Sequence, residues 1–440
     1  MSAQEVIEKG KVGELEELGQ VTSEAEEAKP EPVDDIDSDS PWAALRHRDF
    51  RLLWSGGFVS QLGSQMRIVA IDVQLWDLTH SYAMVGLLGL FQLLPLLGFS
   101  LFGGVLADAF DRRHMMMITQ TTYALSSVVL ALATWQGWVS APLVYAIGAL
   151  GAATTAFDNP ARSALVPNLV PRKDLANALS LNIIIGQMAT IGGPTLAGIL
   201  VATGTSGLAL IYTLDAVSFG AVLVSLFFMR IRTEKPANRN VSLKAVFEGF
   251  HFLRNTPIIM STMSLDFFAT FFGAASVLLP ALSEQVLHVD RSLLGVLYAA
   301  PAMGALVAGL AMSWLGNVHH QGKIVLWSVG AYGVATLVFG LSQNYWLTLV
   351  ALAGTGAADT VSMVMRQTIR QLNTPDELRG RLTSVNMIFY IGGPRLGQLE
   401  AGLGASALGL SPSIAIGGIG VLVVTALIGK LVPSLRVYDR

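Results

Sequence analysis

Six ionisable side chains lie within long apolar stretches of the sequence. They are Arg67, Asp72, Asp215, Asp266, Arg395 and Glu400. A charged group inside a hydrocarbon layer costs about 2.5–3.5 kcal/mol or more, so it is retained there mainly for function. A carboxyl in this setting can take up and release a proton, and a neighbouring arginine can hold its charged form. The side chains that we predict to carry protons are Asp72, Asp266 and Glu400.

The other three groups are predicted to act as charge partners. Asp215 is expected near the outer end of its helix, where a structural pairing or capping role would suffice. For Arg67 and Arg395, and for Glu400, an interhelical ion pair that holds the protein together explains the charge as well as proton coupling does. Both interpretations stay open from sequence alone.

Two of the apolar stretches also carry a polar helical face. At about 100° per residue, the first face contains Gln61, Ser64, Gln65, Asp72 and Trp76. The second contains Asn386, Tyr390, Gly393, Gly397 and Glu400. Arg67 points away from the first face, and Arg395 from the second unless Pro394 bends the helix. We expect both faces to line an internal binding cavity, with Gln61, Gln65, Trp76, Asn386 and Tyr390 as contacts.

The composition places these residues in a membrane. Of the 440 residues, 52% are hydrophobic and only 13% are charged. The runs from His114 to Phe157 and from Leu175 to Leu214 contain no Asp, Glu, Lys or Arg, and each is long enough for two helical spans. The sequence therefore predicts an all-α membrane protein.

Walking along the chain gives twelve predicted transmembrane helices. Their ranges are 53–77, 83–107, 115–136, 141–162, 176–202, 207–229, 256–282, 292–315, 323–341, 345–366, 382–407 and 412–433. When successive loops are assigned to alternate sides of the membrane, 22 of the 25 basic residues after residue 41 fall on the same side. Basic residues accumulate in cytoplasmic loops, so this side is predicted to be cytoplasmic and to hold both termini.

The first 41 residues differ from the rest, with thirteen acidic residues against three lysines. They are predicted to form a disordered cytoplasmic tail. The remaining chain contains a weak repeat, in which segments from Asp158 and from Asp359 both lead to Ile-Gly-Gly-Pro. The repeat predicts two pseudo-symmetric six-helix halves, 42–229 and 256–440, joined by a cytoplasmic loop at 230–255.

The stretch GGVLADAFDRRHMMM, from Gly103 to Met117, joins the second and third predicted helices. Its Gly-x-Leu-Ala-Asp-x-x-x-Arg-Arg pattern resembles the loop signature of the major facilitator superfamily, apart from Ala109 and Asp111. The blocks "HRDFRLLW", "FDNPARSALVPNLVP" and "RGRLTSVNMIFYIGGPRLGQLEAG" resemble the bacterial branch that includes the enterobactin exporter and related multidrug exporters. This resemblance covers about residues 45–435.

The resemblance implies a cytoplasmic gate between the halves. The predicted gate residues are Gly104, Asp108, Arg112, Arg113, Asp158, Arg162, Asp359 and Arg366. Asp158 is a candidate partner for the two adjacent arginines, and Asp108 for the N-terminus of the helix that begins near Arg381. The corresponding loop of the second half, "GLAMSWLGNVHHQGK", lacks the aspartate, so the gate is expected to be asymmetric.

A helix bend is predicted where "ATIGGPTLAG" places Gly193, Pro194 and Gly198. The pattern is similar to the Gly-Pro signature of antiporters in the same family, with Ala189 and Ala197 replacing glycines. Small residues at this spacing also let helices pack closely without any role in coupling. The similarity favours export.

Taken with the family resemblance, these features predict a secondary transporter that exports amphipathic small molecules, either drugs or siderophore-like metabolites, by proton antiport. Its setting would be the bacterial cytoplasmic membrane. Nutrient uptake or lipid translocation by the same fold remains the alternative. The pair His319-His320 has no metal or nucleophile motif beside it, so an enzyme, a metal site, a cofactor and a nucleic-acid partner are not expected. The protein is expected to act as a monomer.

Overall fold

The computed structural model describes residues 40–109, 111–230, 252–254, 256–316 and 318–439. The side chains of residues 100–109, 376, 377, 381 and 384 lie outside this description. The predicted acidic tail and most of the predicted central loop therefore lie outside the described residues. The chain divides into Met1–Ala43 and Ala44–Arg440, and the α-helices belong to the second unit.

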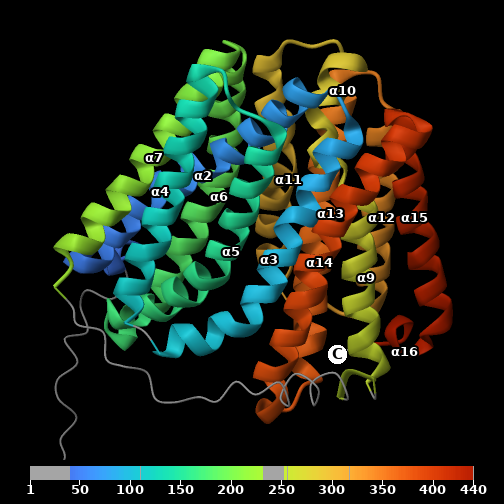
Figure 1. Cartoon of the computed structure of the whole chain (residues 1–440). Coiled ribbons are helices and arrows are strands. Elements are labelled where there is room, and N and C mark those ends of the chain that lie inside the picture. Colours follow the sequence, from blue (N-terminus) through green and yellow to red (C-terminus); the bar gives the residue numbers. More distant parts are fainter. Residues whose placement is uncertain (1–39, 110, 231–251, 255, 317, 440) are drawn as a thin grey trace, which may run out of the picture. The chain divides into compact units, whose positions relative to one another are not determined.

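The described part of the second unit is built from helices (Figure 1). The N-terminal half contains α2 (Arg48–Thr79), α3 (Tyr82–Ala109), α4 (Arg112–Gln136), α5 (Ala141–Leu165), α6 (Leu175–Val201) and α7 (Thr205–Phe228). The C-terminal half contains α9 (Pro257–Gly273), α10 (Leu279–Gln285), α11 (Leu294–Leu315), α12 (Gln321–Leu341), α13 (Tyr345–Leu372), α14 (Asp376–Leu408), α15 (Leu410–Leu431) and α16 (Pro433–Arg436). Short 3-10 turns are η1 (Ala43–Arg46), η2 (Val166–Asn168), η3 (Arg172–Asp174), η4 (Ala275–Leu278) and η5 (Arg291–Leu293). The fold with twelve long helices is confirmed.

One predicted helix is interrupted. The range 256–282 was expected to be continuous, but α9 ends at Gly273 and the chain turns through η4 before α10. Ala274 leaves the helical region, with ψ at 38°, and Pro280 lies in the first turn of α10, where its missing N–H costs nothing. The short helix α10 is thereby placed beside the end of α2, which it contacts.

Length and hydropathy support a membrane setting for these helices. Among the described residues, nine helical segments are long and apolar enough to cross a membrane, the segment Pro257–Gln285 being one of them. The long helices outside that set are α2, α5 and α14. These three carry Arg67, Arg162 and Arg395, which meet at the site described below.

The two halves repeat the same packing. In the N-terminal half α4 packs on α7, α3 on α5, and α2 on α6; in the C-terminal half α12 packs on α15, α11 on α13, and α9 on α14. The contacts between the halves are also paired, since α3 packs on α14 and α6 packs on α11. This correspondence is the pseudo-two-fold arrangement expected of a repeat transporter.

Glycines bring the halves close at one end of the bundle. A methyl group on Gly86 of α3 would lie 2.9 Å from Cα of Gly402 on α14. A methyl group on Gly198 of α6 would lie 2.7 Å from Cα of Gly295 on α11. Both contacts lie toward the end that holds α10 and the α2–α3 link, at the top of Figure 1. We call this the α10 end.

Candidate functional site

A cavity of about 450 Å³ lies among α2, α3, α4, α5 and α7, with α14 contributing one wall. Its polar lining consists of Ser60, Gln61, Ser64, Arg67, Gln92, Gln120, Thr155, Asp158, Asn159, Arg162 and Arg395. It extends from the middle of α2 to the last turns of α5, and so toward the end opposite α10. Its size is that of a typical small-molecule site.

Arg67 of α2 is held by groups from two other helices. Its Nε lies 3.4 Å from Oδ2 of Asp215, and its Nη1 donates a 3.2 Å hydrogen bond to Ser127. The hydroxyl of Ser127 in turn donates to Asp215 at 2.5 Å. The guanidinium also lies 5.4 Å and 5.6 Å from the ring centres of Tyr123 and Phe219, which stack on each other. The charge of Arg67 is therefore balanced locally.

Asp215 lies in the middle of α7 and is fully buried. The sequence interpretation placed it near the outer end of its helix, with a structural role in capping or pairing there. An intrahelical partner for Arg67 was not expected, and its observed partner on α7 required knowledge of which helices pack together.

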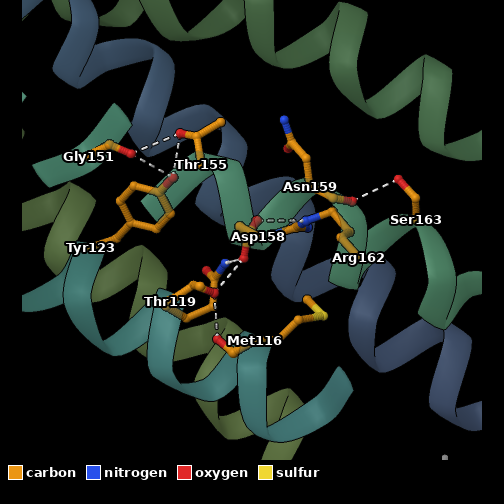
Figure 2. Close-up of polar contacts among 10 residues, drawn as sticks. Met116, Thr119, Tyr123, Gly151, Thr155, Asp158, Asn159, Arg162 and Ser163 are labelled. Atoms are coloured by element: carbon orange, nitrogen blue, oxygen red, sulfur yellow. Dashed lines mark hydrogen bonds and ion pairs between the residues drawn. The ribbon is translucent and has the colours of Figure 1, made fainter. Parts of the chain in front are cut away.

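Asp158 of α5 is surrounded by hydrogen-bond donors (Figure 2). Its Oδ1 accepts bonds of 2.6 Å from the hydroxyl of Thr119 and 2.8 Å from the amide of Gln120. Its Oδ2 lies 3.4 Å from Nε of Arg162, one helical turn further along α5. Three groups from two helices thus satisfy this buried carboxylate.

Arg395 of α14 has a different environment. Its Nη1 donates a 3.4 Å hydrogen bond to Gln398 on the same helix. It forms no ion pair with a carboxylate among the described residues, although it lies within electrostatic range of Asp72. The sequence interpretation turned Arg395 away from the cavity unless Pro394 bent α14. In the structure Arg395 lines the cavity.

The predicted polar face of α2 divides among three surroundings. Gln61 and Ser64 line the cavity as expected. Gln65 donates a 2.8 Å hydrogen bond to Thr190 of α6, so it joins two helices instead. Asp72 and Trp76 lie nearer the α10 end and contact the other half.

The predicted face of α14 packs largely against its own half. Gly393 and Gly397 approach the backbone of Phe267 and Phe271 on α9. Asn386 accepts a hydrogen bond from Arg370 of α13. The remaining members, Tyr390 and Glu400, are exposed and half-buried, and neither lines the cavity. A transmembrane helix carries polar or small residues on packed faces as well as on open ones, so a shared helical face does not by itself place these residues in the cavity.

A second charged cluster lies in the C-terminal half. Asp266 of α9 is buried and its Oδ1 lies 2.9 Å from Nη2 of Arg366 on α13. The same nitrogen lies 3.3 Å from Oδ1 of Asp359, so one guanidinium holds two carboxylates. The other terminal nitrogen of Arg366 is buried without a partner among the described atoms. Asp359 and Arg366 lie on α13, the helix that corresponds in packing to α5 with its Asp158 and Arg162.

Polar contacts cross between the halves at the α10 end. Tyr298 of α11 donates a 2.9 Å hydrogen bond to Asp72 of α2. Further contacts are the Trp76 indole to Glu284 at 2.8 Å, a two-bond ion pair of Arg291 with Asp77 at 2.8 Å and 2.7 Å, and the hydroxyl of Tyr82 to Gln285. A second cavity of about 340 Å³ lies among Trp76, Asp77, Glu284 and Arg291.

The predicted gate is only partly described. Gly104 and Asp108 belong to α3, but their side chains lie outside the described residues. Arg112 donates to the carbonyl of Ala164 and Arg113 to that of Phe227, and neither is paired with Asp158.

Asp111 explains one departure from the loop signature. Its carboxylate accepts hydrogen bonds from the backbone N–H groups of Arg113 and His114, which caps the N-terminus of α4.

The predicted bend residues of α6 lie at helix contacts. A methyl group on Gly193 would lie 2.9 Å from the carbonyl of Leu62 on α2. Gly198 faces Gly295 across the two halves, and Pro194 lies inside the continuous helix. These residues permit close packing of α6 with both halves.

The sequence profile of the transmembrane secretion effector family, a branch of the major facilitator superfamily, matches residues 39–439. The match covers nearly the whole chain. The chain belongs to this family. It is therefore a multi-pass membrane transporter with the major facilitator fold.

Relatives of this transporter include the enterobactin exporter EntS of Citrobacter koseri, which is 29% identical over 90% of this chain and 94% of its own length. EntS of Escherichia coli O1:K1 is 28% identical over the same shares. Among solved structures, a bacterial homologue of the iron transporter ferroportin in an inward-facing state has a TM-score of 0.69 at 15% identity, covering 89% of this chain and 99% of its own. The nucleoside transporter NupG has a TM-score of 0.71 at 12% identity, with the same coverage. These structures share the fold.

The sequence analysis of this transporter missed the contacts at the α10 end. Asp77, Glu284 and Tyr298 were not singled out, because each is an ordinary residue near a helix end or within an apolar run. One signal pointed to Arg291, since it is the single basic residue placed on the outer side of the span map. Its bidentate pair with Asp77 accounts for its position.

Proposed function

We propose that this transporter exports amphipathic small molecules from the cytoplasm in exchange for protons, by alternating access between its halves. The observation that carries the proposal is the placement of the cavity relative to the contacts between the halves. Polar and glycine contacts join the halves at the α10 end, whereas the cavity extends toward the opposite end. Such a state would load substrate from the side opposite α10.

The basic residues support the assignment of that side to the cytoplasm. The end opposite α10 carries Arg112 and Arg113, Arg162 and Lys323, and the exposed residues around Arg436. Positively charged loops stay on the cytoplasmic side of a bacterial inner membrane, so both termini would lie inside. The domain limits 42–229, 230–255 and 256–440 and the acidic tail 1–41 complete this proposed topology.

Two observations favour export over uptake. The relatives from Citrobacter koseri and Escherichia coli are enterobactin exporters. The Gly-Pro element at Gly193, Pro194 and Gly198 lies where α6 meets both α2 and α11, so a change in its packing would move both halves. An amphipathic substrate suits the cavity because stacked aromatic rings and polar groups line it together.

For proton coupling we favour Asp266 among the three candidate carboxyls. Protonation of Asp266 would remove its attraction for Arg366, which is shared with Asp359. The guanidinium would then be free to move toward Asp359, and α9 and α13 could shift relative to one another. Asp72 and Glu400 remain candidates: Asp72 is hydrogen-bonded across the halves, and Glu400 has no hydrogen-bond or ion-pair partner among the described residues.

Inverted membrane vesicles with an acidic interior test this proposal. Fluorescein, tetramethylrhodamine ethyl ester and the neutral dye Nile red are supplied outside, and accumulation is compared with vesicles that lack the transporter. At least one dye should accumulate, and nigericin, which collapses the pH gradient, should abolish the accumulation. No accumulation of any dye, or accumulation only in right-side-out vesicles, would contradict export.

The coupling residue is tested in the same vesicles. Asp266→Asn should abolish the dependence on the pH gradient, whereas Asp290→Asn, at an exposed outer position, should behave as the unchanged protein. Asp72→Asn and Glu400→Gln complete the set. Undiminished gradient-driven transport in all three intramembrane variants would exclude proton coupling through these carboxyls.

The gate forms the last part of the proposal. Two ion pairs lie on corresponding helices of the two halves, Asp158 with Arg162 on α5 and Asp359 with Arg366 on α13. We expect their charged groups to exchange partners as the cytoplasmic side closes. Asp108 would hold that closed state by meeting the N-terminus of α14. Asp108→Asn should then populate the inward-facing state and reduce turnover without preventing insertion, and unchanged turnover would leave only a basic turn at this position.

A further inference from the structure

The charges that line the central cavity do not balance. Three arginines face it, namely Arg67, Arg162 and Arg395, against the single carboxylate of Asp158. Arg162 pairs with Asp158, and Arg67 pairs with Asp215 behind the wall. Arg395 is the lining arginine without an ion-paired carboxylate among the described residues. The cavity therefore presents a net positive charge at the wall formed by α14.

The surroundings of Arg395 make this charge available to a ligand. Its one hydrogen bond among the described atoms, to Gln398, is long at 3.4 Å. Asp72 lies within electrostatic range but is bound to Tyr298 and is not among the lining residues. An uncompensated guanidinium at a partly buried position is costly, and a carboxylate or similar oxyanion offers it two parallel hydrogen bonds.

Other parts of the cavity lining provide groups for the rest of such a ligand. Tyr123 and Phe219 stack with ring centres 5.1 Å apart and border the cavity, with the Arg67 guanidinium over both rings. The side-chain carbonyls of Gln92 and Gln120 are buried and accept no hydrogen bond from a described group. Both residues line the cavity, so a rotation of either side chain would bring its carbonyl to a hydroxyl or N–H of the ligand.

We propose that the cavity binds an aromatic organic anion that also carries hydrogen-bond donors, with Arg395 holding its negative charge. The inference rests on the proposed function for the identity of the site, and it specifies the class of substrate. Arg67 and Arg162, whose charges are already paired with Asp215 and Asp158, shape the cavity. Gln92 and Gln120 position the ligand by accepting hydrogen bonds from its donor groups.

Direct binding to the purified full-length transporter tests the proposal without any transport step. Fluorescence anisotropy is measured with fluorescein, an anion, and with tetramethylrhodamine ethyl ester, a cation on the same xanthene ring system. Fluorescein should bind at least about tenfold more tightly, because a charge-assisted pair is replaced by repulsion. Equal or tighter binding of the cation would overturn the proposal, and this comparison needs no variant to fold.

Variants assign the effect to one residue. Arg395→Gln should weaken fluorescein binding by about tenfold or more, and Arg395→Lys should retain part of it, since a lysine keeps the charge but loses the paired geometry. Arg436→Gln, at an exposed position outside the cavity, should bind as the unchanged protein. Unaltered fluorescein binding in Arg395→Gln would overturn the role of Arg395.

The two assays separate failure of this inference from failure of the proposed function. If only the cationic or neutral dye were exported, the proposed export function would be supported and the proposal of an anionic substrate would be contradicted. If fluorescein binding depended on Arg395 but no dye were exported in vesicles, the anion-binding site would be supported and the proposed export function would be contradicted.

Discussion

Tyr298 donates a 2.9 Å hydrogen bond to Asp72, and this bond joins α11 of one half to α2 of the other. Both residues lie where the halves also meet through glycines and through the ion pair of Arg291 with Asp77. A rocking motion that opens the α10 end must break all of these contacts. Their strength therefore contributes directly to the balance between the two states.

The first prediction concerns that balance. Tyr298→Phe removes the hydrogen bond but keeps the ring. The equilibrium constant for opening at the α10 end should therefore rise by about two- to tenfold, which corresponds to the free energy of one buried hydrogen bond. The chain contains no cysteine, so single cysteines can report accessibility without background. Reactivity of Ser283→Cys, beside the second cavity, should rise, and that of Ser64→Cys in the central cavity should fall.

The control for this measurement is Tyr345→Phe. Its hydroxyl donates to the carbonyl of Leu293 within the same half, so its loss should leave both reactivities unchanged. If Tyr298→Phe and Tyr345→Phe gave the same labelling, the bond to Asp72 would have no part in the conformational balance.

The second prediction concerns the charge of Asp72. Arg395 lies within electrostatic range of this carboxylate, so Asp72→Asn should strengthen the binding of fluorescein by roughly two- to fivefold. Asp290→Asn, at an exposed position outside the cavity lining, should leave the affinity unchanged. Weaker binding in Asp72→Asn would contradict the proposed position of the anion.

The sign of this effect bears on the mechanism. In antiport, protonation of the coupling carboxyl should favour release of the substrate. For an anion near Arg395, protonation of Asp72 would instead favour retention, because it removes a competing negative charge. An anionic substrate thus disfavours Asp72 as the coupling group and leaves Glu400 and the favoured Asp266, whose ion pair lies in the C-terminal half.

The third prediction concerns the glycine contact between α3 and α14. A methyl group on Gly402 would lie 2.9 Å from Cα of Gly86 and 2.5 Å from the carbonyl of Tyr82, so backbone would have to move. Gly402→Ala should separate the halves at the α10 end and reduce dye export several-fold. Gly220→Ala, where a methyl group meets no atom within 4 Å, is the matched control and should export normally. Normal export by Gly402→Ala would show that this contact can relax.

The helices of this protein were predictable because apolar runs and charge asymmetry are local signals. The side of each helix that faces the cavity was less predictable. Arg395 lines the cavity, although helical periodicity turned it away unless Pro394 bent the helix, and Gly393 packs on α9. Periodicity identifies which residues share a face, but the direction of that face depends on which helices become neighbours.

Contacts between distant residues were the least predictable part of the site. The ion pair of Arg67 with Asp215 joins helices that are far apart in the chain, and the bond from Tyr298 to Asp72 spans both halves. Neither residue spacing nor composition encodes such a pairing. Charged residues within apolar helices indicated that these positions matter. Their partners became known only from the packing of α2 on α7 and against the other half.

The last prediction separates structural charge from binding charge. Asp215 is fully buried and the side chain of Arg67 is 13% exposed, so Asp215→Asn leaves a buried guanidinium without its counter-charge. The free energy of unfolding should fall by about 3–5 kcal/mol, measured by thermal denaturation in detergent, whereas the exposed Asp290→Asn should have no effect.

A double variant completes this test. Replacing both partners, as Arg67→Met with Asp215→Leu, should restore most of the stability because no buried charge remains. It should also weaken fluorescein binding less than Arg395→Gln does, since the removed pair was neutral overall while Arg395 carries the unbalanced charge. A larger loss of binding in the double variant would place the anion at Arg67 and its aromatic neighbours instead.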